Sequence, residues 1–176
     1  AGDDVLRGTP RVDVICGLLA TVWILAALQH RSVTGEGQRV EVNLLSSLLS
    51  GLVNQASGFA AAGAVPGIIG NRHPSIAPYE SFPTADTPFV IAVGNDRQFR
   101  SCVEVLGVPG LADDARFRTN PDREQHREEL VALMSDRLRT RGAADWFDAL
   151  SAVGVPCGPI NDLAGAFALA SRLGLA

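Results

Sequence analysis

The sequence contains no lysine, because all fifteen of its basic residues are arginines. Schiff-base chemistry and lysine general-base catalysis are therefore excluded within this chain. Aromatic residues make up only 6% and charged residues 19%, whereas hydrophobic residues reach 47%, enough to build a core. The net charge is −4 and no basic cluster is present, which argues against binding of nucleic acid.

Cysteine, histidine and methionine are scarce. The three cysteines, Cys16, Cys102 and Cys157, share no C-x-x-C spacing, which favours reduced thiols in a cytoplasmic protein over a disulfide framework. No second His or Cys lies at metal-ligand spacing from His73, so we expect no metal site. The single methionine is Met134, so the chain does not begin with one, and we expect a processed or truncated product or an excerpt.

The longest uncharged run, Val14 to Gln29, is short for a membrane span. It falls below the roughly 20 apolar residues that a bilayer requires, and Asp13 directly precedes it. A secretory signal is disfavoured because no small-x-small cleavage site follows. We therefore expect a buried helix from Asp13 to about Arg31, apolar on nearly every side, and no membrane partner.

The other segments predict a helix-dominated α/β or α+β protein. Composition changes near Gly70, where we place a domain boundary, and the proline-containing segment 71–83 is expected to be a loop. Periodicity and end signals predict the following elements: helices at 44–62, 97–106, 121–139 (charged, on the surface) and 143–153, a last helix from 161, short strands at 39–43 and 89–93, and an extended segment at 155–160.

Asp13 is the residue best placed for chemistry. Free backbone N–H groups and the macrodipole at a helix N-terminus stabilise a carboxylate, which could attack an activated acyl carbon such as a thioester. Asp is also a preferred N-cap residue, and position alone favours that structural role.

The positions of three further residues, His73, Asp96 and His126, bear on function. His73 lies in a loop beside Arg72, so it is a general-base candidate next to a possible anion-binding group, although packing roles are commoner. Asp96 follows the end of a predicted strand, where it could equally cap the next helix. We expect His126, within a charged segment, to be solvated.

Four stretches of the chain, in this order, resemble the family III CoA transferases, the group that includes formyl-CoA transferase, carnitine CoA-transferase and α-methylacyl-CoA racemase. The resemblance covers residues 9–168 and is more specific in its combined order than in any single motif. One departure is Asp86-Thr87, where the family usually has Asp-Gly. The stretches are VDVICGLLATVWILAALQHRSVTGEGQRVEVNLL, GNRHPSIAPYESFPTAD, FVIAVGNDRQF, and LGVPGLADDARFRTNPDREQHREEL continued by WFDALSAVGVPCGPIND.

The resemblance implies a mechanism. Asp13 occupies the position of the family's catalytic aspartate, which forms a mixed anhydride with the donor acyl group and then an aspartyl-CoA thioester. His73, Tyr79 and Asp96 would lie near the substrate. Coenzyme A, as acyl-CoA, is the only cofactor-like ligand implied, and no metal is.

The resemblance also implies an architecture. Residues 1–69 would supply the catalytic-Asp helix, a short strand and a linker helix of the large domain. Residues 70–168 would form a small α+β domain, and 169–176 would start a segment returning to the large domain. The family's N-terminal Rossmann-like half, which supplies most CoA contacts, is absent from this sequence, and family members form interlocked homodimers.

Two alternatives to CoA transfer remain open. The first is α-methylacyl-CoA racemisation, which needs an Asp and a His as a proton-exchanging pair; GNDRQF looks more like the transferase version of that stretch. The second is a catalytically inactive, dimerising module. In either case we expect the first helix to expose a hydrophobic surface that the missing half would cover, so the bare chain should self-associate.

Overall fold

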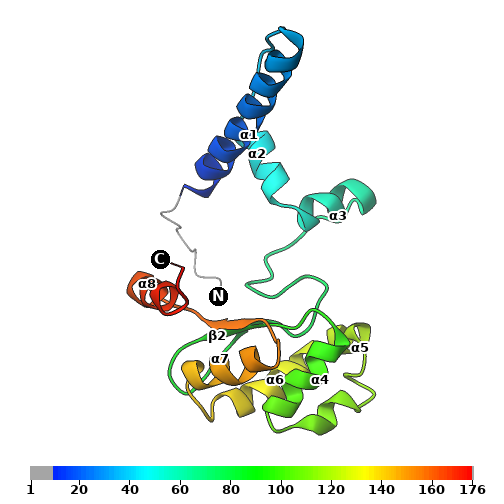
Figure 1. Ribbon diagram of the computed structural model, residues 1–176. Coiled ribbons are helices and arrows are strands. Elements are labelled where there is room, and N and C mark those ends of the chain that lie inside the picture. Colours follow the sequence, from blue (N-terminus) through cyan, green and yellow to red (C-terminus); the bar gives the residue numbers. More distant parts are fainter. Residues whose placement is uncertain (1–9, 176) are drawn as a thin grey trace. The chain divides into compact units, whose positions relative to one another are not determined.

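The structure is a computed structural model, and it describes residues 10–175 (Figure 1). The chain divides into two compact units, Ala1–Ile68 and Ile69–Ala176. The first unit holds only helices among its described residues, and the second combines a small antiparallel sheet with helices. The protein is therefore a helix-rich α/β chain, as its sequence predicts.

The first unit is built on a pair of packed helices, α1 (Arg11–Thr34) and α2 (Leu44–Gly51), followed by α3 (Asn54–Ala62) (Figure 1). A Cβ added at Gly51 would lie 3.1 Å from the Ile15 side chain, so the glycine lets the end of α2 approach the start of α1. This contact braces the first turns of α1, where Asp13 lies.

Two predictions for this unit are wrong. The helix expected over 44–62 is broken after α2, where Val53 adopts a positive φ of 43°. The strand expected at 39–43 does not form, because every strand of the described residues belongs to the second unit and the segment has no neighbour to pair with.

Helix α1 is not buried within this chain, contrary to the expectation from its composition. None of its residues is fully buried, and Leu18 and Leu25 expose 64% and 61% of their surfaces. The separate expectation of an exposed hydrophobic surface on this helix is confirmed. An 18-residue window of α1 has a mean hydropathy of 2.0, so the helix is long and apolar enough to cross a membrane, a property that core helices of soluble proteins share.

The second unit contains a three-stranded antiparallel sheet in the order β1-β2-β3, formed by Tyr79–Phe82, Phe89–Ala92 and Cys157–Pro159. Phe89 pairs with Phe82 on one side and with Pro159 on the other. Strand β2 therefore matches its prediction, whereas β1 lies inside the segment expected to be a loop. Prolines on both sides of its four residues hide the strand in the sequence.

Four helices lie on one side of this sheet: α4 (Asp96–Val105), α5 (Asn120–Gln125), α6 (Arg127–Leu138) and α7 (Ala143–Ala152) (Figure 1). The expected surface helix over 121–139 is in fact two helices, broken at His126, and it has a buried face. His126 is half-buried with its ring edge-on to Phe117, so it is not simply solvated. The unit also contains the short 3-10 helix η1 (Pro109–Ala112) and α8 (Leu163–Arg172).

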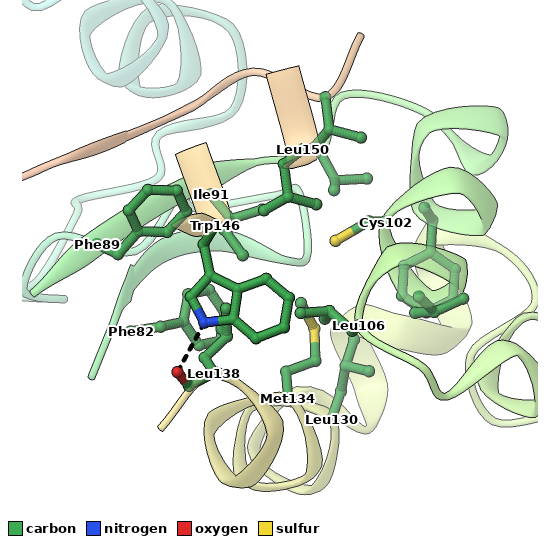
Figure 2. Close-up of a cluster of buried hydrophobic side chains, with 14 of the residues drawn as sticks. Phe82, Phe89, Ile91, Cys102, Leu106, Leu130, Met134, Leu138, Trp146 and Leu150 are labelled. Atoms are coloured by element: carbon green, nitrogen blue, oxygen red, sulfur yellow. Dashed lines mark hydrogen bonds between the residues drawn. The ribbon is translucent and has the colours of Figure 1, made fainter. Parts of the chain in front are cut away.

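Trp146 of α7 lies at the centre of the core of this unit (Figure 2). Phe89 and Ile91 reach it from β2, and Met134 reaches it from α6. The indole N–H donates to the Leu138 carbonyl at 2.8 Å, so the polar atom of this large side chain is satisfied inside the core.

The turn between β1 and β2 is fastened to α7 by Asp86. Its carboxylate accepts from the N–H groups of Ala143 and Thr87, at 2.8 and 2.7 Å, and thereby caps the start of α7 from a distant part of the chain. Val53 is the one non-glycine residue with a positive φ in the described chain, so Thr87 fits this turn without backbone strain despite the family's usual glycine.

Candidate active site

Asp13 is the third residue of α1 and its side chain is exposed. The first hydrogen bond of the helix runs from the Val14 N–H to the Pro10 carbonyl, at 3.1 Å. The N–H groups before it have no partner within the helix, so the carboxylate stands beside the positive end of the macrodipole of a 24-residue helix.

The capping role considered for Asp13 is wrong. The N-cap position belongs to Pro10, and no side chain accepts a capping hydrogen bond there. Within residues 10–175, no hydrogen bond or ion pair engages the Asp13 carboxylate. Among these residues nothing competes with a ligand for its oxygens, and the helix fixes the backbone that carries them.

Helix α2 supports this end of α1. Asn43 caps α2 by accepting from the Ser46 N–H at 2.9 Å, and its own carbonyl accepts from the Ser47 hydroxyl at 2.8 Å. Ser47 is almost fully buried, the only such side chain in the described part of this unit. These contacts fix the start of α2, and the end of the same helix, at Gly51, packs against Ile15 of α1.

His73 and Tyr79, two residues named from the sequence, lie together in the second unit. Their rings stack at a centroid distance of 5.1 Å, and the His73 N–H donates to the Tyr79 carbonyl at 2.8 Å. The His73 ring also accepts from the Ser75 N–H at 3.2 Å through Nδ1, which leaves Nε2 as the second ring nitrogen for a ligand. Tyr79 is more than a third exposed, so the pair faces solvent.

Asp96 forms an ion pair with Arg123 of α5, at 2.7 Å. The Asp96 side chain is 58% exposed, whereas that of Arg123 is fully buried. Asp96 is not the cap of α4, because Asn95 fills that position and accepts from the Gln98 N–H. The buried Arg123 guanidinium thus holds one oxygen of Asp96 from the protein interior, while the Asp96 side chain remains exposed to solvent.

The buried Arg123 is the important residue that our sequence analysis missed. A signal for it exists: Arg123 and Arg127 continue, at helical spacing, the buried stripe that Leu130, Met134 and Leu138 form on α6. Because both residues are charged and lie in a charged segment, the sequence pattern predicts that they belong to a solvated helix face. Charged side chains are seldom fully buried unless they are paired.

A second buried charged group lies close by. Glu80 of β1 is 3.5 Å from a guanidinium nitrogen of Arg127, and both side chains are largely buried. Burial raises the pKa of Glu80, and the positive charges of Arg127 and Arg72 oppose that rise. Arg127 also donates to the Ile76 carbonyl, so it links β1 to the segment before it.

No group of three or more His, Cys, Asp or Glu side chains that could hold a metal ion occurs among residues 10–175. Asp13 belongs to the first unit, and His73, Tyr79 and Asp96 belong to the second.

Residues 1–172 match the family described as CoA-transferase family III, and the chain belongs to this family. It is 38% identical to the acetyl-CoA:oxalate CoA-transferase of Acetobacter aceti over 157 residues, which cover 89% of this chain and 40% of that protein. It is also 38% identical to the succinyl-CoA:glutarate CoA-transferase of Mus musculus over 172 residues, which cover 98% and 39%. The chain thus spans about two fifths of the length of these relatives.

Solved structures show the same fold. A CAIB/BAIF family protein from Brucella suis is 38% identical, with a TM-score of 0.72 over 95% of this chain and 44% of that chain. Rv3272 from M. tuberculosis, at 23% identity, has a TM-score of 0.80 over 94% of this chain and 43% of its own.

Proposed function

We propose that the intact protein is an acyl-CoA:carboxylate CoA-transferase that works through a covalent intermediate on Asp13. The observation that carries this proposal is the exposed Asp13 carboxylate in the first turn of α1, which makes no capping hydrogen bond. The chain that carries it belongs to the family III CoA-transferases. An oxygen nucleophile for an acyl carbon needs a lone pair that no other group engages, and the Asp13 carboxylate has no hydrogen-bond or ion-pair partner among residues 10–175.

The exchange takes four balanced steps. An oxygen of Asp13 attacks the thioester carbon of the donor; the C–S bond breaks, CoA leaves as its thiolate, and a mixed anhydride remains. The thiolate then attacks the Asp13 acyl carbon, which releases the donor acid as a carboxylate and leaves an aspartyl-CoA thioester. The acceptor carboxylate attacks that thioester; the C–S bond breaks, CoA leaves again as its thiolate, and a second mixed anhydride forms. The thiolate then attacks the acceptor's acyl carbon; the anhydride C–O bond breaks, the acceptor leaves as its acyl-CoA, and the Asp13 carboxylate is restored.

Dicarboxylic acids are the substrates that we propose. Several relatives are named for transfer to or between oxalate, succinate, glutarate and mesaconate, each of which carries two carboxylates. One carboxylate would react at Asp13, and the other would need recognition by donors elsewhere. His73, Tyr79 and Asp96 are the residues of the second unit that we expect near the substrate.

The proposal includes the setting of the enzyme. Residues 1–69 would belong to the family's large domain, and 70–168 would form its small domain. We expect a cytoplasmic homodimer. CoA enters as substrate, and most of its contacts would come from a Rossmann-like half outside this sequence.

The test uses the intact protein with pairs of dicarboxylates and acyl-CoAs in deuterated buffer, with the products read by mass spectrometry. We expect CoA to move between acids and no deuterium to enter the α-carbon. The variant Asp13→Asn should lose transfer, whereas Asp145→Asn should not. Asp145 is the matched control because it is also an exposed acid at the third position of its helix, α7.

Deuterium at the α-carbon without CoA transfer would contradict the proposal and identify a racemase. Transfer that survives in Asp13→Asn at the level of Asp145→Asn would contradict the role of Asp13 and leave the family activity in place.

A further inference from the structure

Two side chains of α5, Asn120 and Arg123, hold the backbone that precedes β1. Arg123 Nε donates to the Ala77 carbonyl at 2.7 Å. Asn120 uses both ends of its amide: it donates to the Ser75 carbonyl at 2.9 Å and accepts from the Ala77 N–H at 3.1 Å. We call these two residues the α5 clamp. It secures three backbone groups of a segment that has no regular secondary structure of its own.

Arg123 is itself immobilised. Its guanidinium is fully buried, stacks over the Phe99 ring at 4.4 Å, and donates to the Phe117 carbonyl at 3.1 Å. Its remaining nitrogen donates to Asp96 at 2.7 Å. A planar group with several fixed donors therefore joins Asp96 to the Ala77 backbone, and a lysine cannot reproduce that geometry.

The clamped backbone lies between His73 and Tyr79, whose rings stack and whose backbones are hydrogen-bonded. The position of this ring pair therefore depends on the segment between its two members. The buried guanidinium of Arg123 is thus linked to all three residues expected near the substrate, to Asp96 directly and to the ring pair through the Ala77 backbone.

We propose that Arg123, assisted by Asn120, is a positioning residue that sets the His73–Tyr79 pair and Asp96 for substrate binding. This role rests on the proposed CoA transfer, because it needs a substrate that meets these residues. Arg123 touches no substrate itself. Its effect must therefore pass through the ring pair and through Asp96, so the effects of substitutions at Arg123 and at His73 should overlap and be non-additive.

The experiment measures KM and kcat of the intact protein for Arg123→Lys, His73→Ala and the double variant. We expect Arg123→Lys to raise KM for one substrate by about tenfold, the effect of one misplaced hydrogen-bonding contact. The double variant should show a smaller effect than the two single effects combined, because they share the route through the ring pair. Asn120→Ala, which removes two bonds to the segment, gives a milder variant of the same kind in case Arg123→Lys does not fold.

Two controls separate positioning from loss of folded protein. Arg137→Lys alters another arginine whose Nε donates to a carbonyl, that of Leu106 at 3.1 Å, without touching the clamp. Leu150→Ala weakens the core from α7. Both should leave KM unchanged, because a smaller folded fraction lowers only the apparent kcat.

The outcomes are distinct. Two results with active wild-type protein would overturn the positioning role alone. The first is an unchanged KM in both Arg123→Lys and Asn120→Ala. The second is full additivity of the effects of Arg123→Lys and His73→Ala. Wild-type protein that transfers no CoA would overturn the proposed function and the positioning role with it.

Discussion

The two tryptophans of the chain provide a sharp test of where its stability resides. Trp146 is 1% exposed in the core of the second unit, whereas Trp23 on α1 is 58% exposed. We predict that Trp146→Phe strongly destabilises the protein and that Trp23→Phe in the 176-residue chain does not.

The magnitude follows from what Trp146 contacts. Replacement by Phe removes the hydrogen bond to the Leu138 carbonyl, with a net cost of about 1 kcal/mol. The Arg141 N–H, 3.5 Å from the same carbonyl, remains as a weak partner and limits that cost. The lost ring volume leaves a cavity in a packed core, which costs about 1 to 2 kcal/mol more. The sum is about 2 to 3 kcal/mol, a large part of the roughly 5 to 15 kcal/mol that stabilise a domain.

Urea unfolding followed by far-ultraviolet circular dichroism measures both variants. Trp23→Phe should lie within about 0.5 kcal/mol of the wild type, as for other exposed sites. Equal effects of the two substitutions, or a loss below about 1 kcal/mol for Trp146→Phe, would refute the view that this indole organises the core.

Two further predictions concern the turn at Asp86 and the surface of α1. Hydrogen bonds from the Ala143 N–H, the Thr84 hydroxyl and the Thr87 N–H lower the pKa of Asp86. The stability that the Asp86 carboxylate contributes is present above the ordinary Asp pKa of about 3.9 and is lost as the pH falls through the lowered pKa. Asp86→Asn should therefore flatten the decline of Tm below about pH 4. A pH profile of Tm that is unchanged in this variant would contradict the prediction. The 176-residue chain alone should self-associate and transfer no CoA. Sedimentation should show less association for Leu25→Glu, and a monodisperse wild-type monomer at micromolar concentration would contradict the expectation.

The parts of the fold that the sequence predicted well are those whose signal is local. Strand β2 is a short, continuous apolar run, and the apolar residues of α7 recur at helical spacing; both elements agree with their predictions to within a residue. A single stretch of sequence reveals each of these patterns.

Features that depend on distant contacts were not predictable in this way. The segment 39–43 alternates like a strand but has no neighbour to pair with in the described chain, whereas β1 is a strand because β2 lies beside it. The break at Val53 has no glycine or proline at that residue to signal it.

The residues of the candidate sites show the same difference between local and long-range information. Asp13 could be singled out because its position before an apolar run is local information. The burial of Arg123 is decided by acceptors far along the chain, the Ala77 carbonyl and Asp96. A charged residue in a charged segment gives no local sign that it is buried.

The most direct test of the account is chemical trapping on Asp13. The intact protein is incubated with a reactive acyl-CoA and quenched with hydroxylamine, and the peptide that contains Asp13 is read by mass spectrometry. We predict an aspartyl hydroxamate on Asp13 that requires the acyl-CoA, since hydroxylamine captures both an aspartyl anhydride and an aspartyl thioester. Active CoA transfer with Asp13 unmodified, or with the hydroxamate on another carboxylate, would contradict the account.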